Sequence, residues 1–225
     1  MKIQGKIFRK LSPFFRFIYR IYASFDHSYT FRGLKIAVNK GTFNPVLFHS
    51  TIDLIEYIDS LDKNESSFLE LGCGSAMASI YFSKKGLDTT AIDLSEKALE
   101  NGKKNASLNN LTINFKKSDL YENTGDDLFD IVFINPPYFP RDAESEEDIA
   151  WFCGPSFEYY ENLFEQMKSR QLEKELTLMV LSDQCDIGKI EALAIDKNLT
   201  MEKVFSKEHL YESILIYRIS PSSLP

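Results

Sequence analysis

Apolar and polar positions along the chain predict strands and helices that follow one another in turn. Short apolar runs, or runs in which every second residue is apolar, predict β-strands, whereas apolar residues that recur every three or four positions predict amphipathic helices. By this criterion the predicted strands are residues 34–38, 67–71, 87–93, 111–115, 129–134, 176–181, 200–205 and 213–219. The predicted helices are residues 47–61, 76–85, 95–108, 157–174 and 187–196.

The order of these elements predicts an α/β fold. From residue 67 onward strands alternate with helices, which is typical of a mostly parallel sheet with helices on both faces. The last two strands have no helix between them, so we expect them to pair antiparallel at the end of a seven-stranded sheet. In such sheets ligands bind beyond the carboxyl ends of the strands. The residues that follow each strand are therefore the first candidates for a functional site.

The first 40 residues differ in charge from the rest of the chain. They contain nine Lys or Arg residues and one acid, so they carry +8, whereas the whole chain carries −7 and residues 41–225 therefore carry −15. Ser12-Pro13 and the apolar stripe after it predict a helix with Arg16 and Arg20 beside the stripe. We expect a basic helix and strand extension over residues 1–40. Its helix packs on the body, contacts RNA or lies on an anionic membrane surface, and the sequence leaves these alternatives open.

Composition places the chain among globular proteins. Of its 225 residues 44% are hydrophobic, ten are Gly and eight are Pro, which excludes collagen-like and wholly disordered chains. The three cysteines and three histidines lack the spacing of a metal site, so no metal is expected. No apolar stretch approaches the roughly 18 residues of a spanning helix, and basic residues interrupt the N-terminus. We therefore expect no transmembrane segment and a cytoplasmic location.

Three predicted strands end in residues that suit a nucleoside. The strand at residues 67–71 ends in the segment Glu70-Leu71-Gly72-Cys73-Gly74-Ser75-Ala76, whose glycines form a turn and allow the backbone to approach a ligand. The next strand ends in Asp93, a carboxylate that can accept hydrogen bonds from both hydroxyls of a ribose. A third strand is followed by Asp119, where an acid can face an adenine edge. Each feature alone also fits an ordinary turn or a helix cap, but together they indicate a nucleoside site.

The strand at residues 129–134 is followed by Asn135-Pro136-Pro137-Tyr138. Two prolines cannot continue the sheet, and they stiffen the chain directly after Asn135. The side-chain oxygen of Asn135 and the carbonyl of Pro136 are therefore expected to converge as two acceptors, which suit an NH2 group. The ring of Tyr138 can stack on the plane that carries this group.

In order and spacing, these residues resemble the class I S-adenosylmethionine-dependent methyltransferases. The Asn-Pro-Pro-Tyr segment is similar to the motif of their small-domain group, which includes the HemK/PrmC glutamine methyltransferases of peptide-release factors and amine methyltransferases of RNA or DNA bases. The resemblance covers about residues 41–219 and implies a Rossmann-like class I methyltransferase domain over residues 41–225. It also implies S-adenosyl-L-methionine as the cofactor and a protein, RNA or DNA methyl acceptor.

The resemblance assigns a set of residues to the cofactor: Thr51, Glu70, Gly72, Gly74, Asp93, Asp119, Leu120 and Asn135. Within this set, Glu70 and the two glycines would line the methionine part, and Asp93 would hold the ribose. Asp119 and Leu120 would border the adenine. Thr51 matches a position that helps to close the cofactor pocket in HemK-like proteins. The residues assigned to catalysis are Asn135 and Pro136, which would bind the target amino group, with Pro137 and Tyr138, which would shape its slot.

Two departures from the family pattern affect the prediction. Ala76 stands at the usual third glycine, and Met77 stands where a dinucleotide fingerprint requires glycine, which disfavours an oxidoreductase. The helical docking domain of release-factor methyltransferases has no match in residues 1–40.

We therefore predict an N-methyltransferase that acts on a planar amino nitrogen, either a glutamine amide or the exocyclic amine of a base. The alternative is a non-catalytic nucleotide-binding module whose basic arm docks on RNA or a membrane. The acidic residues 142–148 fit a solvated loop or one that attracts a basic substrate.

Overall fold

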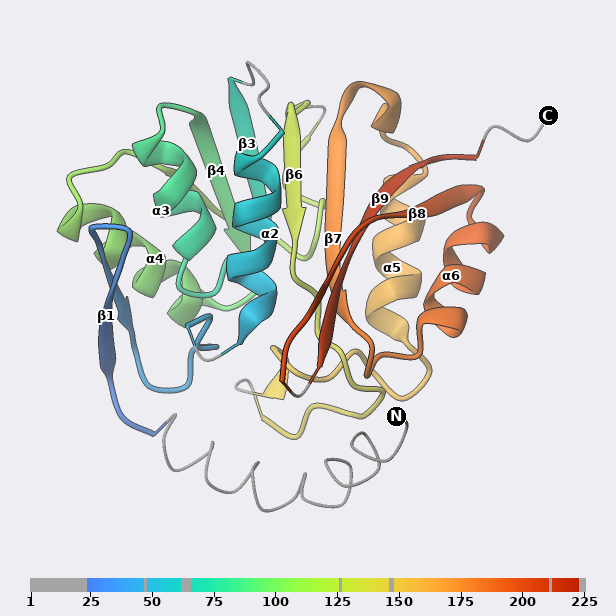
Figure 1. Ribbon diagram of the computed structural model, residues 1–225, viewed down its shortest axis with the longest axis horizontal. Helices are drawn as coiled ribbons and strands as arrows, with labels where there is room; N and C mark the ends of the chain where they lie inside the picture. The colour runs from blue at the N-terminus through green and yellow to red at the C-terminus, as the bar shows by residue number, and fades with distance from the viewer. Residues whose placement is uncertain are drawn as a thin grey trace.

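The structure is a computed structural model that describes residues 24–46, 48–61, 66–125, 127–145, 148–210 and 212–222. Its centre is a seven-stranded sheet in the order β5-β4-β3-β6-β7-β9-β8 (Figure 1). The first five strands in this order are parallel, and β9 is antiparallel to both of its neighbours. The predicted fold class, with its C-terminal antiparallel pair, is confirmed. The strands are β3 (Ser67–Leu71), β4 (Asp88–Asp93), β5 (Asn114–Lys117), β6 (Ile131–Ile134), β7 (Leu176–Ser182), β8 (Leu199–Glu208) and β9 (Ser213–Pro221).

Helices cover both faces of this sheet (Figure 1). One face carries α2 (His49–Asp59), α3 (Met77–Lys84) and α4 (Glu96–Leu108), and the other carries α5 (Glu158–Met167) and α6 (Ile187–Asp196). Successive residues of a strand point to opposite faces, so each strand contributes to two apolar cores. In β3, Phe68 packs with the core under α2 and α3, and Leu69 packs with the core under α5 and α6.

A separate antiparallel hairpin, β1 (His27–Phe31) and β2 (Leu34–Val38), lies against α4 (Figure 1). Only β2 was predicted. The signal for β1 was present, because aromatic side chains alternate with polar ones from His27 to Phe31 and a two-residue turn follows. Arg32 and Gly33 in this turn have φ of 47° and 83°, as a tight hairpin turn of this kind requires.

Three asparagines at intervals of four, two on α4 and one at its C-terminal cap, bind the edge of β2. Asn105 accepts a hydrogen bond from the backbone nitrogen of Ala37 and donates to its carbonyl, both at 2.8 Å. Asn109 does the same with Lys35, at 2.9 and 2.8 Å. Asn101 accepts from the nitrogen of Asn39 and donates to the Ala37 carbonyl. These amides replace a neighbouring strand, so the exposed edge of β2 is satisfied by a helix. The domain boundary after residue 40 stays a prediction.

We expect Asn105→Ala to lower the free energy of unfolding by about 2 kcal/mol, because it leaves the buried Ala37 amide and carbonyl without this partner. Asn105 also donates to the Ser75 carbonyl at 2.8 Å, so the variant weakens the turn after β3 as well. Urea denaturation measures the difference. Glu100→Ala, at an exposed position of the same helix, is the control and should stay within about 0.5 kcal/mol of the parent. Equal midpoints for Asn105→Ala and the parent would contradict the role of the asparagines.

The boundaries of β5, α5 and β8 (predicted at residues 200–205) differ from the predicted ones by three residues or more at one end. The strand expected at residues 111–115 runs from Asn114 to Lys117, because Leu111 and Ile113 pack on the core beside α3 before pairing begins. The helix expected at residues 157–174 ends at Met167, and a short 3₁₀ helix η2 (Leu172–Lys174) follows. The turn between them directs Arg170 inward, where it lies 2.7 Å from the fully buried carboxylate of Glu175.

Some predictions fall wholly or partly beyond the described residues. The helix expected after Pro13, with Arg16 and Arg20, lies outside them. In the part of the chain that the structure describes, no helix is long and apolar enough to cross a membrane. The three cysteines, Cys73, Cys153 and Cys185, are buried and carry free thiols.

Candidate active site

Four loops begin at the same edge of the sheet. Since β3, β4, β5 and β6 are parallel and each is hydrogen-bonded to another of the group, their carboxyl ends meet there. The loop after β3 contains the glycine turn, Asp93 ends β4, Asp119 follows β5 and Asn135 follows β6. The fold therefore brings together residues that are far apart in the sequence, such as Glu70 and Asn135, which are separated by 65 positions.

The turn after β3 leaves its backbone open to a ligand. Gly72 and Gly74 have φ of 76° and 52°, a region that favours glycine. A Cβ at either glycine would meet no atom within 4 Å, so a ligand can lie directly against the chain. The nitrogens of Gly72 and Cys73 donate to the Ile92 carbonyl at 2.9 and 2.8 Å, which attaches the turn to β4. Ala76, at the usual third glycine, adopts the same left-handed conformation, with φ of 58°.

Asp93 connects the glycine turn to the loop after β4. Its Oδ2 accepts a hydrogen bond from the nitrogen of Gly74, and its Oδ1 accepts one from the nitrogen of Ser95, each at 2.9 Å. Ser95 in turn caps α4, as predicted, by accepting from the nitrogen of Ala98. A carboxylate offers about four acceptor positions. Both oxygens are therefore fixed in place beside the turn, and the role of Asp93 toward a ribose stays a prediction.

Glu70 lies beneath the glycine turn, with only 4% of its surface exposed. Its Oε2 accepts hydrogen bonds from the backbone nitrogen and the hydroxyl of Ser79, at 2.8 and 2.5 Å, and so caps the first turn of α3. Burial raises the pKa of Glu70 to about 7, against the opposing effect of these hydrogen bonds, and the nearby charge of Asp93 raises it further. The contacts place Glu70 as a support for the turn. Its contact with the methionine part of a cofactor stays a prediction.

Glu70 is expected to make the protein less stable as the pH rises. The pKa of its carboxyl is about 7 in the folded chain and 4.5 in its unperturbed state, so the folded chain binds more protons between these values. The stability that this group contributes is therefore fully present below pH 4.5 and is lost as the pH rises through 7. We expect Glu70→Gln to flatten this dependence in urea denaturation between about pH 5 and pH 8. Glu100→Gln is the control. Identical pH profiles for the parent and Glu70→Gln would contradict the shifted pKa.

The loop after β5 and the start of α5 border the predicted adenine position. Asp119 is exposed, whereas Leu120 is buried and has φ of 51°. Tyr159, in the first turn of α5, is half-buried. Burial raises the pKa of Tyr159, and the charges of Asp93 and Asp119 raise it further. Tyr159 was not among the predicted site residues, because the apolar pattern of α5 is carried by its fully buried neighbours and not by this half-buried ring.

The Asn135 side chain is held at both ends of its amide. Its Nδ2 donates to the hydroxyls of Ser50 and Thr51, at 3.2 and 3.0 Å, in the first turn of α2. Its Oδ1 accepts from the Tyr138 hydroxyl at 3.2 Å. A carbonyl oxygen has two lone pairs, so Oδ1 keeps one for another donor. Thr51 is thereby placed beside Asn135, and its contact with a cofactor stays a prediction.

The two prolines are buried and their carbonyls differ in their partners. Pro137 accepts a hydrogen bond from the hydroxyl of the buried Tyr160 at 3.0 Å, which fixes the segment to α5. No donor among the described residues reaches the Pro136 carbonyl. Burial raises the pKa of Tyr138, so its hydroxyl stays a donor. The arrangement offers the Asn135 oxygen and the Pro136 carbonyl as acceptors beside the ring of Tyr138.

A family model matches the chain over residues 49–152, from the first residue of α2 to beyond the Asn-Pro-Pro-Tyr segment. Its description is the methyltransferase small domain. Residues 49–152, a little under half of the chain, are therefore similar to this family. The predicted family resemblance is confirmed over this range, and the match does not favour a non-catalytic nucleotide-binding module.

Curated proteins that are similar to the chain include two named as glutamine methyltransferases. A protein named as a protein N5-glutamine methyltransferase from Methanocaldococcus jannaschii is 34% identical over 118 residues, which are 52% of this chain and 57% of the relative. The release factor glutamine methyltransferase of Streptococcus pneumoniae is 35% identical over 120 residues, or 52% of this chain and 42% of the relative. The chain thus spans about half the length of these relatives.

Solved structures of methyltransferases share the fold at low sequence identity. The E. cuniculi Mtq2–Trm112 complex, described as responsible for methylating the termination factor eRF1, matches with a TM-score of 0.61 and 16% identity, over 81% of this chain and 99% of that one. The T. thermophilus 16S rRNA N2 G1207 methyltransferase, solved with AdoMet and guanosine, matches with a TM-score of 0.57 and 16% identity, over 86% of this chain and 50% of that one. The predicted class I methyltransferase fold is confirmed.

Proposed function

We propose that this protein is an S-adenosylmethionine-dependent N-methyltransferase whose acceptor is the side-chain amide of a glutamine in a protein. The observation that carries the proposal is the pair of acceptors at Asn135 and Pro136, which lies at the same sheet edge as the open glycine turn. An NH2 group that bonds to both oxygens has its nitrogen fixed next to that turn. This is the placement that transfer of a methyl group to nitrogen requires.

The residues around the turn fit the cofactor. Open space at Gly72 and Gly74 accepts a ligand against the backbone, and Asp93 offers carboxylate oxygens to the ribose hydroxyls. The half-buried Tyr159 and the buried Leu120 offer apolar surface to an adenine, with Asp119 at its edge. When bound, S-adenosylmethionine supplies an electrophilic methyl group on a sulfonium.

The acceptor residues act by orientation. The nitrogen of an amide or of a base amine is a weak nucleophile, because its lone pair is delocalised into the neighbouring π-system. Two acceptors that bind its hydrogens fix the plane of the NH2 group and direct the lone pair toward the methyl group. Positioning of this kind contributes up to roughly 7–11 kcal/mol to catalysis in favourable cases. Asn135 accepts hydrogen bonds without taking a proton, so the proton released after transfer passes to water.

Two observations favour a protein acceptor over a nucleic acid. Both curated relatives described above are named as glutamine methyltransferases, whereas the rRNA methyltransferase shares only the fold with this chain. Among the described residues that follow the motif, Asp142 and Glu144 are acidic and exposed, against one exposed base, Arg141. Such charge repels phosphate and attracts a basic protein surface. The basic residues 1–23 lie outside the described residues and would act in the opposite sense.

A labelling experiment tests the acceptor class. The purified protein is incubated with a cell extract and S-adenosylmethionine that carries a labelled methyl group, and the product is treated with protease or with nuclease. We expect label that protease releases and nuclease does not, with Asn135→Ala as the inactive control. If nuclease and not protease releases the label, the acceptor is a base amine and not a glutamine amide. Absence of label in all fractions would contradict the proposed activity.

A further inference from the structure

We infer that Ser50 and Thr51 are positioning residues that hold the Asn135 amide in its working orientation. An amide side chain can rotate to exchange its oxygen and nitrogen, and only the oxygen can accept a hydrogen bond from an acceptor NH2. Both hydroxyls receive the Nδ2 hydrogens of Asn135, at 3.2 and 3.0 Å, so Oδ1 is the atom directed away from α2. This inference deepens the proposed function and rests on it.

Both hydroxyls are buried, which makes their contacts with Asn135 costly to lose. Ser50 is 2% exposed and Thr51 is 4% exposed. A buried hydrogen-bonding group without a partner destabilises the protein, so exchange of the amide ends would have to rearrange both hydroxyls and the Tyr138 hydroxyl together. Three hydroxyls thus hold the amide in place before an acceptor binds, and exchange of its ends requires all three to reorient.

The first turn of α2 is itself anchored to the β8–β9 hairpin. Asp53, one turn further along α2 and 1% exposed, lies 2.8 Å from the Lys207 ammonium and 2.5 Å from His209 Nε2. The His209 ring stacks on His49, the first residue of α2, with 3.7 Å between centroids and 8° between planes. Loss of a partner from a buried carboxylate is strongly destabilising, so these contacts fix the position and orientation of the turn that carries Ser50.

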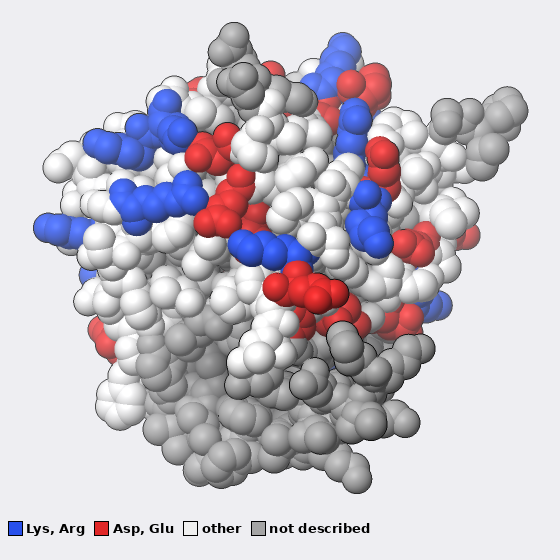
Figure 2. Space-filling view, in the orientation of Figure 1, with Lys and Arg blue, Asp and Glu red and all other residues white. Residues whose placement is uncertain are grey.

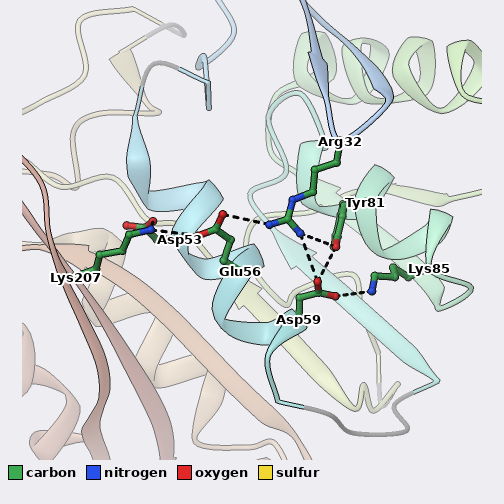
Figure 3. A network of polar contacts seen from close by, with 7 residues as sticks. All are labelled: Arg32, Asp53, Glu56, Asp59, Tyr81, Lys85 and Lys207. Atoms are coloured by element: carbon green, nitrogen blue, oxygen red, sulfur yellow. Dashed lines mark hydrogen bonds and ion pairs between the residues drawn. The ribbon is translucent and has the colours of Figure 1, made fainter.

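The other side of α2 is held by a second group of polar contacts (Figure 3). Asp59 binds Lys85 at 2.7 Å and Arg32 at 3.4 Å, and it accepts a hydrogen bond from Tyr81 at 2.9 Å. Glu56 contacts both Arg32 and Lys207, each at 3.2 Å, and so links the two sides. Acidic and basic side chains accordingly lie side by side over this face (Figure 2). Exposed pairs of this kind are individually weak, but together they restrain α2 between the β1–β2 hairpin and β8.

Nuclear magnetic resonance of the Asn135 side chain tests the inference without an acceptor. Protein labelled with ¹⁵N-asparagine is compared with Ser50→Ala, Thr51→Val and the double variant, and the Asn135 NH2 signals are assigned by their loss in Asn135→Asp. We expect solvent exchange of these hydrogens to accelerate by roughly fivefold in each single variant and by more than about tenfold in the double variant. Thr51→Ser should restore the parent rate. Ser60→Ala, which removes an exposed hydroxyl at the other end of α2, is the control.

Kinetics on the acceptor found by labelling provide the second readout. We expect the double variant to lower kcat by roughly tenfold or more. Ser50→Ala alone, which leaves the predicted cofactor residue Thr51 in place, should lower kcat with the KM for S-adenosylmethionine unchanged, because only the positioning of the amine is lost. Unchanged NH2 exchange in the double variant would overturn the inference, as would an unchanged kcat. These results are distinguishable from failure of the proposed function, in which the parent protein itself transfers no methyl group.

Discussion

Asn135→Ala is expected to lower the rate of methyl transfer by roughly 100-fold, because a small misplacement of the reacting nitrogen forfeits much of the gain from orientation. The substitution removes the acceptor Oδ1 and leaves the two prolines and the end of β6 in place. The affinity for S-adenosylhomocysteine should stay the same, since the glycine turn and Asp93 are unchanged. Single-turnover transfer and calorimetry measure the two quantities separately.

The control for this variant is Asn162→Ala, which removes an exposed amide on α5. It should retain the parent rate. A rate for Asn135→Ala within a factor of about two of the parent would contradict the assignment of Asn135, because positioning accounts for far more than that. A large loss of cofactor affinity together with the loss of rate would show that Asn135 acts chiefly on the cofactor.

Asp93→Ala is expected to weaken binding of S-adenosylhomocysteine by roughly 100-fold or more. Hydrogen bonds to a carboxylate contribute about 1.5–3 kcal/mol each, and the variant removes those to both ribose hydroxyls. It also removes the acceptors for the Gly74 and Ser95 nitrogens, so the turn that faces the cofactor becomes less ordered. Calorimetric titration measures the dissociation constant.

Asp88→Ala provides the matched control, because Asp88 is exposed at the opposite end of the same strand. Its dissociation constant should equal that of the parent protein. Asp93→Asn keeps one acceptor oxygen and should fall between the parent and Asp93→Ala. An unchanged dissociation constant in Asp93→Ala would remove Asp93 from the cofactor site.

Much of the fold followed from local patterns in the sequence. β3, β6 and β7 were predicted within two residues at each end, because these central strands are apolar on both faces. β1 and the boundaries of β5 and α5 were not predicted correctly. The alternating pattern of β1 is present in the sequence and was overlooked. The end of α5 depends on tertiary contacts, because Arg170 turns inward to the buried Glu175.

The candidate site was likewise predictable only in part. The residues at the strand ends were predictable, because a parallel sheet brings the ends of its strands to one edge. The partners of Asn135 were not, since Ser50 and Thr51 lie 85 and 84 positions earlier and reach it only after α2 has packed on the sheet. The helical pattern placed both hydroxyls near the start of a helix, but it contained no signal for what they bind.

Location of the transferred methyl group tests the central claim most directly. The methylated acceptor is isolated after reaction with labelled S-adenosylmethionine, digested, and analysed by tandem mass spectrometry. With the parent protein we expect the methyl group on a planar nitrogen, at the side-chain amide of a glutamine, and with Asn135→Ala we expect no methyl group there. A methyl group on carbon, on oxygen or on a lysine amine would contradict the account, because none of these acceptors requires two oxygens that bind a conjugated NH2.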